Sequence, residues 1–156
     1  MTPPVRRRTR AREIALQLLF QFDLRGERYA EELGRDLDAL IAEESQGDAE
    51  VATFARRLVD GTLHHRQALD ERLRAVTRNW DLKRMAAVDR NVLRMSIFEL
   101  SHCADVPPKV AINEAIELGK KYSTANSGGF INGILDRVRM DLEQERATAG
   151  EQTGNA

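Results

Sequence analysis

The residues best suited to chemistry in this chain are arginines near the N-terminus. Arg6, Arg7, Arg8, Arg10 and Arg12 lie in one short segment that contains no acidic residue. Guanidinium groups bind phosphate oxygens through paired hydrogen bonds, and the start of a helix also favours anions. Because we identify no local structural use for these arginines, the segment favours contact with nucleic-acid phosphates. A solvated basic tail without a ligand is the alternative, and residue types alone leave both open.

Groupings typical of catalysis or of metal binding are missing from the sequence. His64 and His65 are adjacent, as are His102 and Cys103, and neither arrangement has the spacing of a metal site. There is no glycine-rich phosphate loop and no nucleophile elbow. We therefore predict a protein that is not an enzyme and that uses no metal or cofactor.

Composition and charge favour an α-helical protein. The chain has 156 residues, of which 42% are hydrophobic and 31% are charged, with many Leu, Ala, Glu and Arg. The formal net charge of -1 does not indicate a partner, but the N-terminus is basic and the segment after Tyr29 is acidic. Cys103 is the only cysteine, and no apolar run is long enough for a membrane span. Since no secretory signal is recognisable, we expect a cytoplasmic protein.

Apolar residues recur at helical spacing along most of the chain, so the predicted fold class is all-α. The predicted organisation is a basic flexible arm over residues 1–9, an N-terminal helical subdomain over 10–78, a C-terminal helical subdomain over 79–145 and a disordered tail over 146–156. Trp80, the only tryptophan, is expected to pack where the two halves meet.

Capping residues and glycines set the expected helix boundaries. Asp48 is expected to cap the third helix, and Asp105 is expected to cap the helix whose first turn holds Pro107 and Pro108. The apolar pattern that follows Asp48 and continues to Val76 fits either one kinked helix or two helices. The other predicted helices cover residues 10–24, 29–44, 89–102 and 130–145. Apolar residues point in most directions from helix 89–102, which should therefore be the central helix of the second half of the chain.

Residues 123–129 are polar and rich in small residues, so they are predicted to form a loop before Phe130. Gly133 follows inside the last helical pattern, where glycine costs about 1 kcal/mol relative to alanine. It marks either close packing of another helix within the protein, which we favour, or the approach of a partner.

Three segments carry a resemblance to a known family. They are RRRTRAREIALQLLFQFD near the start, VDRNVLRMSIFEL in the middle, and DVPPKVAINEAIELGKKYS with SGGFINGILD near the end. Together they resemble the NusB family of bacterial transcription antitermination factors, over roughly Arg6 to Val138. The resemblance implies an all-α fold of two small helical bundles packed together.

The resemblance also implies function without catalysis. NusB-like proteins pair with NusE, a small ribosomal subunit protein, and the pair binds the boxA sequence of nascent RNA. The pair then helps RNA polymerase to read through terminators, notably in ribosomal RNA operons. Some relatives self-associate through the RNA-binding surface, so a homodimer is a further expectation.

In the family, RNA contacts come from the arginine-rich arm and from the loop before the last helix. The positions that match here are Arg6, Arg7, Arg8, Arg10, Asn126, Ser127, Gly129 and Phe130. Family members often have an acidic residue in place of Asn126, and a basic or bulky pair in place of Gly128 and Gly129. Loss of an acid reduces repulsion of RNA, so we expect boxA binding to be kept.

Two other functions stay open. The chain could be a detached NusB-like RNA-binding module of a ribosomal RNA cytosine methyltransferase, since such domains occur at the N-terminus of some of these enzymes, fused to a Rossmann-like catalytic domain. The chain could also be a structural helical oligomer without an RNA role. The acidic second helix would suit a basic ribosomal-protein partner, although the sequence does not identify the docking surface.

Overall fold

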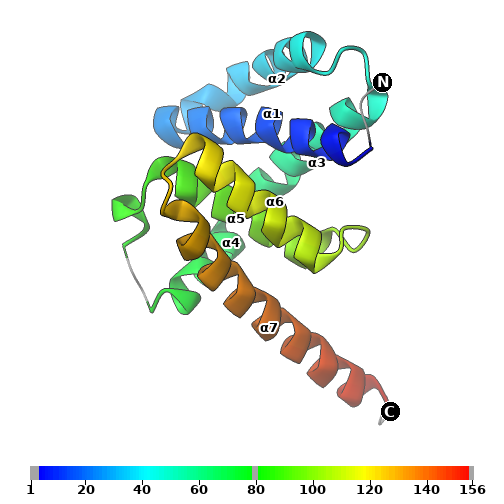
Figure 1. The fold of residues 1–156 in the computed structure, drawn as a ribbon, viewed down its shortest axis with the longest axis vertical. Coiled ribbons are helices and arrows are strands. Elements are labelled where there is room, and N and C mark those ends of the chain that lie inside the picture. The colour runs from blue at the N-terminus through cyan, green and yellow to red at the C-terminus, as the bar shows by residue number, and fades with distance from the viewer. Residues whose placement is uncertain (1–3, 79–80, 155–156) are drawn as a thin grey trace.

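The structure, a computed structural model, describes residues 4–78 and 81–154, and all regular structure in these ranges is helical (Figure 1). The α-helices are α1 (Pro4–Arg25), α2 (Ala30–Glu44), α3 (Ala49–His64), α4 (Arg66–Val76), α5 (Ala87–His102), α6 (Pro108–Tyr122) and α7 (Ser127–Gly154). Two short 3-10 helices, η1 (Glu27–Tyr29) and η2 (Leu82–Arg84), join them. The predicted all-α fold class is confirmed. No helix in the described ranges combines the length and apolar character that a membrane crossing needs.

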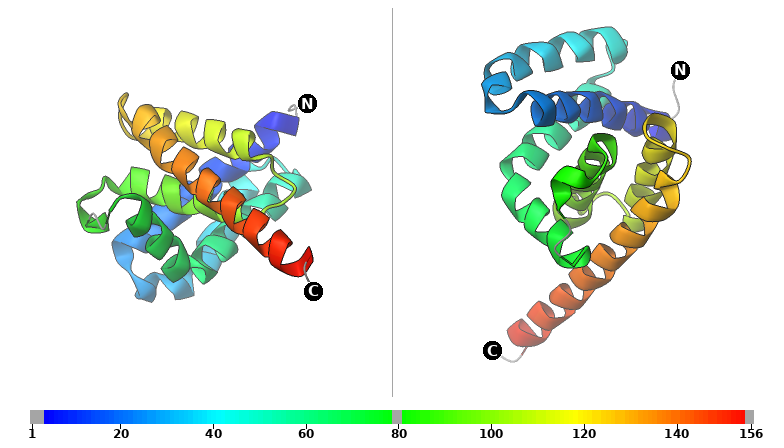
Figure 2. Two further views of the ribbon diagram at one scale, coloured as in Figure 1. Left: turned by 90° about the horizontal axis from the view of Figure 1, so that it is seen from below. Right: turned by 90° about the vertical axis from the view of Figure 1, so that its left-hand side faces the viewer.

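Helix α5 is the centre of the fold. Every residue from Asn91 to Leu100 is buried, and α1, α3, α4, α6 and α7 all pack on it. The right-hand view of Figure 2 shows α5 enclosed by the other helices. Its apolar side chains point in most directions because it has neighbours on most sides. The sequence predicts a central helix of the second half only; because α1 and α3 also pack on α5, it is central to the whole fold.

The other helices form two groups around α5. Helix α2 packs mainly on α1 and α3, while α6 and α7 pack on each other and on α5. Helix α4 packs more on α5 and α7 than on α3. This packing favours a boundary between α3 and α4 over the predicted one at residue 78, and the division into subdomains remains a proposal. Asn79 and Trp80 lie outside the described residues, so the expected position of Trp80 stays a prediction.

The span from residue 49 to Val76 forms two helices, which meet at His65. The His65 ring stacks on His102 at the end of α5, with 4.0 Å between ring centroids. One turn earlier, a Cβ built on Gly61 would lie 2.0 Å from Cζ of Phe98. A glycine at this position therefore lets α3 approach α5 closely just before the chain turns.

Helix α1 is longer than predicted at its N-terminal end. It begins at Pro4, so the part of the expected flexible arm that the structure describes is helical. A proline can begin a helix because the first N–H groups of a helix have no acceptor within it. The arginines are consequently presented from a rigid helix.

Helix α7 extends well beyond both predicted ends, from Ser127 to Gly154, and the tail expected to be disordered is helical up to that residue (Figure 1). Contacts with the body support the first part of the extension. Leu142 is buried, Arg72 of α4 binds Glu145 with two hydrogen bonds of 3.0 and 2.9 Å, and Arg146 donates to the Leu100 carbonyl at 2.9 Å.

One predicted helix cap is confirmed and another is wrong. The Asp48 carboxylate accepts hydrogen bonds from the Glu50 and Val51 N–H groups, at 3.0 and 3.4 Å, and so caps α3. Asp105 does not cap α6, whose N-cap residue is Pro107. The Asp105 carboxylate binds arginines instead, which a sequence pattern confined to neighbouring residues does not reveal.

Candidate nucleic-acid interface

The candidate arginines occupy the first turns of α1. Arg6 is exposed, whereas Arg7, Arg8 and Arg10 are partly buried. The expectation that nothing local uses the arginines is wrong for most of the cluster, because acidic residues from several other elements lie against them.

Arg7 and Arg10 pair with acids near the junction of α2 and α3. Nε of Arg7 lies 2.9 Å from Oδ2 of Asp48, and its Nη1 donates to Oε2 of Glu50 at 3.3 Å. Nη1 of Arg10 donates to the Glu44 carbonyl at 3.2 Å and lies 3.7 Å from the Glu44 carboxylate. Partly exposed pairs of this kind contribute about 1 kcal/mol or less each. They hold the arginines in place, and because both members of each pair are partly exposed, water and other anions compete with the acids.

Arg8 shares one carboxylate with Arg57 of α3. Nη2 of Arg8 donates to Oδ2 of Asp105 at 3.0 Å. Nη1 and Nη2 of Arg57 donate to Oδ2 and Oδ1 of the same residue, at 3.1 and 2.8 Å. The hydrogen bonds from Arg57, and secondarily those from Arg8, hold the pKa of Asp105 well below its usual value. The carboxylate is therefore ionised throughout the physiological pH range.

Arg12 differs from the other arginines because it is 1% exposed. Its Nη2 donates to Oε1 of Glu99 at 2.6 Å and its Nε donates to the same atom at 3.0 Å, and Glu99 is also 1% exposed. Arg12 thereby joins α1 to the central helix α5. We assign it a structural role and exclude it from the candidate interface.

The second candidate region lies at the start of α7, which begins at Ser127 and not at Phe130. Asn126 is exposed in the loop, whereas Ser127 is 2% exposed. Thr124 donates its N–H to Oγ of Ser127 at 3.2 Å, and the Ser127 N–H donates to the Thr124 carbonyl at 3.1 Å. Ser127 therefore fixes the helix start from within, while Asn126 is free to face a ligand.

The two glycines and Phe130 take different positions on the first turn of α7. Gly129 is exposed, and a Cβ on it would meet nothing within 4 Å. A Cβ on Gly128 would lie 2.8 Å from Cε of Lys120, so a larger residue would have to displace the end of that side chain. Phe130 is partly buried and packs against the core.

A groove of about 590 Å³ adjoins the loop. It is lined by Asp81, Arg84, Met85, Ala86, Asp89, Thr124, Asn126, Ser127 and Phe130. Two of these residues are acidic, and Oδ1 of Asp89 is buried without a hydrogen-bond partner in the described residues. The lining thus places the guanidinium group of Arg84 beside two carboxylates, so the groove offers acceptors for N–H donors of a ligand as well as one cation for an anion.

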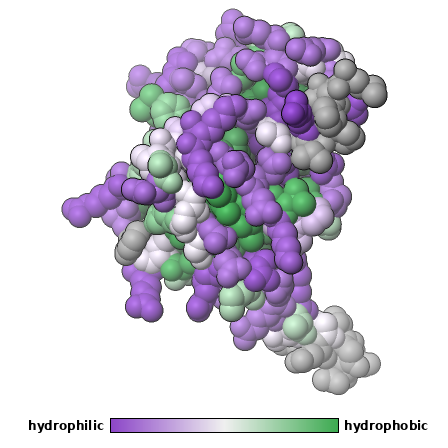
Figure 3. Space-filling model, in the orientation of Figure 1, coloured by the Kyte–Doolittle hydropathy of each residue, from purple (hydrophilic) through white to green (hydrophobic). Residues whose placement is uncertain are grey.

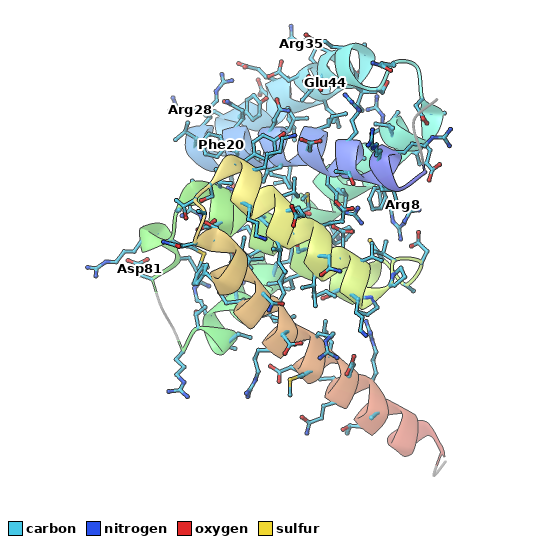
Figure 4. All side chains as sticks on the ribbon, in the orientation of Figure 1. Arg8, Phe20, Arg28, Arg35, Glu44 and Asp81 are labelled. Atoms are coloured by element: carbon cyan, nitrogen blue, oxygen red, sulfur yellow. The ribbon has the colours of Figure 1, made fainter. Side chains whose placement is uncertain are left out.

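The structure does not bring the arm and the loop into one pocket. Asp105, beside the arm, precedes α6, and Asn126 follows α6. Because a helix of 15 residues is about 22 Å long, the length of α6 separates the two regions. Figure 4 shows Arg8 and Asp81, which lines the groove, on opposite sides of the molecule. Side-chain bonds join α1 to α6 between them, from Thr9 to Glu114 at 2.8 Å and from Lys121 to Glu13 at 2.7 Å. On the face of the molecule that carries α6, mostly hydrophilic side chains lie at the surface, with smaller apolar patches among them (Figure 3).

Sequence reasoning missed the acids that face the arginine cluster and the contribution of Arg57. Asp105 is 97 positions from Arg8 in the sequence, and Glu99 is 87 positions from Arg12. No periodic pattern links residues so far apart. The sequence offers one signal for Arg57: it is a charged residue off the apolar stripe of α3, so it is expected to face outward and be able to bind an anion.

Comparison with known proteins gives one consistent family. The sequence profile described as the NusB family matches residues 9–140. The protein named transcription antitermination protein NusB of Anaeromyxobacter dehalogenans is 51% identical over 140 residues, which cover 90% of this chain and 95% of that protein. The protein of the same name from Myxococcus xanthus is 46% identical over 139 residues, which cover 88% and 97%.

Solved structures agree with these sequence matches. NusB of T. maritima is 36% identical, with a TM-score of 0.77, covering 90% of this chain and 93% of that chain. A chain in the crystal structure of the antitermination factors NusB and NusE in complex with dsRNA is 27% identical. Its TM-score is 0.76, and the match covers 87% of this chain and 98% of that chain.

Proposed function

Because this chain belongs to the NusB family, we propose that it is an RNA-binding transcription antitermination factor. In this function it pairs with NusE and binds boxA-type single-stranded RNA, so that RNA polymerase reads through terminators, notably in ribosomal RNA operons. It acts by binding, without catalysis, in the cytoplasm. The family match over residues 9–140 carries the proposal, and the fold shared with a NusB in a complex with NusE and RNA supports it.

The arm of α1 supplies the phosphate contacts of this function. Arg6 is exposed, and Arg7, Arg8 and Arg10 are held by partly exposed acids that an RNA backbone can replace. Guanidinium groups on a rigid helix lose little conformational entropy on binding, which favours a defined path for the RNA.

The loop end of the interface supplies hydrogen bonds and stacking. We assign Asn126 and Phe130 to ligand contact, with Gly129 permitting close approach, and we assign Ser127 to holding the loop because it is buried. A strand of RNA that runs along α6 would meet the arm at one end and this loop at the other.

The charge of α2 would suit a basic partner such as the ribosomal protein NusE. The exposed acidic residues of α2 are Glu31, Glu32, Asp36, Asp38 and Glu43. Such a surface would attract a basic partner and speed its association. Relatives named NusB are matched over 95% and 97% of their own length, so the chain corresponds to nearly the whole of each of these factors.

The direct test is titration with RNA in the presence of NusE. We expect tighter binding to a boxA-containing RNA than to a scrambled RNA of equal length and composition. Equal affinities for the two RNAs would reject the boxA antitermination function and leave the two alternatives, a methyltransferase RNA-binding module and a structural helical oligomer.

A further inference from the structure

We propose that Arg8 and Arg57 form a phosphate-binding clamp for the RNA backbone, and that Asp105 occupies this clamp in the free protein. The proposal rests on the proposed function, and it adds α3 and the loop before α6 to the interface. It makes Asp105 an internal competitor of RNA.

The clamp is built from two helices around one aromatic ring. Arg8 comes from α1 and Arg57 from α3, and the ring of Phe54 lies beneath both. The guanidinium carbon of Arg8 is 4.3 Å from the ring centroid, and that of Arg57 is 6.0 Å from it. The ring is 3% exposed, so it is a fixed support that keeps the two guanidinium groups close together.

The Asp105 carboxylate shows what the clamp can bind. Its two oxygens accept three hydrogen bonds of 2.8–3.1 Å, two from Arg57 and one from Arg8. A phosphodiester group also presents two charged oxygens, and guanidinium groups bind it in the same paired geometry. The carboxylate therefore stands in for a phosphate.

The occupant of the clamp can be displaced. The side chain of Asp105 is 47% exposed and that of Arg57 is 38% exposed, so water competes for their hydrogen bonds. The turn that carries Asp105 is held separately, by the Val106 N–H donating to the Cys103 carbonyl at 2.9 Å. Loss of the Asp105 contacts therefore need not unfold the loop.

Local charge also favours a regulatory role for Asp105. Arg8 has a second acid nearby, with its Nε 3.7 Å from Oε1 of Glu50. In the free protein the positive charge of the clamp is thus balanced by carboxylates. An incoming phosphate must displace Asp105, and this displacement lowers the affinity for RNA. RNA binding at the clamp therefore also needs the contacts that the rest of the arm makes.

The test compares neighbouring arginines of α3 in RNA titrations with NusE and boxA-type RNA. Arg57→Ala should weaken binding about threefold or more, because one phosphate contact is lost. Arg57→Lys should recover only part of the affinity, since an ammonium group keeps the charge but not the paired hydrogen bonds. The matched control is Arg56→Ala, which removes an exposed arginine of the same helix that pairs instead with Asp38.

The second arm of the test removes the competitor. Asp105→Asn should tighten RNA binding about threefold, because the phosphate no longer has to displace a carboxylate. The gain should vanish when Asp105→Asn is combined with Arg57→Ala. Glu71→Gln makes the same change in net charge at an exposed residue of α4, away from the clamp, and should leave the affinity unchanged.

Equal affinities for Arg57→Ala and Arg56→Ala would overturn the clamp, as would equal tightening by Glu71→Gln and Asp105→Asn. Either result leaves the proposed function intact if the wild-type protein still prefers boxA RNA. If Asp105→Asn lowers the Tm, its RNA affinity no longer reports on the clamp alone. The comparison of Arg57→Ala with Arg56→Ala then decides whether the clamp exists.

Discussion

Arg8 and Arg12 lie one turn apart on α1, yet their surroundings give them different roles. Arg8 faces partly exposed acids at the surface, whereas Arg12 is 1% exposed and bound to Glu99 of the central helix. Both guanidinium groups lie near the ring of Phe54, at 4.3 and 5.2 Å from its centroid. Residue type and charge are the same, so burial decides which arginine holds the fold and which is available to RNA.

The pairing partners differ in the same way. A buried ion pair contributes little over an apolar pair, but loss of one member leaves an uncompensated charge in the protein interior. A surface pair contributes about 1 kcal/mol or less, and water or another anion can replace either member. Substitutions on the two sides of α1 should therefore have opposite patterns of effect on stability and on RNA binding.

The largest expected effect is on the buried side. Arg12→Ala leaves Glu99 buried without its partner, and should lower the free energy of unfolding by about 3–5 kcal/mol. For a chain of this size the corresponding fall in Tm is roughly 6–20 °C. Thermal unfolding followed by circular dichroism measures it. Arg25→Ala, an exposed arginine of the same helix that pairs with Glu32, is the control and should change the Tm little; equal effects would contradict the comparison.

The next effect concerns the exposed side. Changing Arg6, Arg7 and Arg8 together to Ala should weaken binding to boxA-type RNA by about tenfold or more, because several phosphate contacts are lost. The Tm should change by only a few degrees, since the lost ion pairs are at the surface.

The control for the arm variant is a second triple substitution with the same change in charge. Arg28, Arg56 and Arg74 are exposed and lie outside the arm, and their replacement by Ala should leave RNA affinity nearly unchanged. If the two triple variants bind RNA equally weakly, net charge and not the position of the arm sets the affinity.

A smaller effect is expected at the far end of the interface. Asn126→Asp adds a negative charge at an exposed position beside a groove that already holds two carboxylates. It should weaken RNA binding a fewfold, by like-charge repulsion, without changing the Tm. Fluorescence anisotropy with labelled boxA RNA and NusE measures the change, and Asn126→Gln should bind like the wild type. Unchanged binding by Asn126→Asp would remove this loop from the interface.

The smallest effect is expected at Gly133. A Cβ at this exposed helical position would meet nothing within 4 Å, so the favoured prediction of close packing within the protein is wrong. Gly133→Ala should stabilise the free protein by about 1 kcal/mol, or roughly 2–4 °C in Tm. A loss of NusE or RNA binding in this more stable variant would indicate that a partner approaches α7 here; unchanged binding would leave the glycine without a role in the interface.

The fold class and most helix positions could be predicted because they depend on local patterns. The apolar stripes and the cap at Asp48 are features of short segments, and they gave the central helix and the start of α3. Sequence patterns predict both α1 and α7 too short, because a proline near the first end and polar residues near the last are typical of segments outside helices. Pro4 is compatible with the first turn of a helix, and contacts of Glu145 and Arg146 with the body support the extension of α7.

The charge state of the candidate site could not be predicted in the same way. Arg6, Arg7 and Arg8 were recognised from their type and spacing, but the acids that neutralise two of them come from residues 48, 50 and 105. Nothing in the sequence shows that Arg12 is buried beside Glu99 or that Arg57 reaches Asp105. These relations arise only when α1, α3 and α5 pack together.

The most direct test of the account is the salt dependence of RNA binding in the wild-type protein and in the Arg6, Arg7 and Arg8 triple variant. With NusE and boxA RNA, log K falls linearly with log salt concentration, at about 0.7 per neutralised phosphate on a single strand. If the arm binds the RNA backbone, the slope of the triple variant should be shallower by about 2, while its Tm stays near that of the wild type. Equal slopes for the two proteins would contradict the assignment of the arm to RNA.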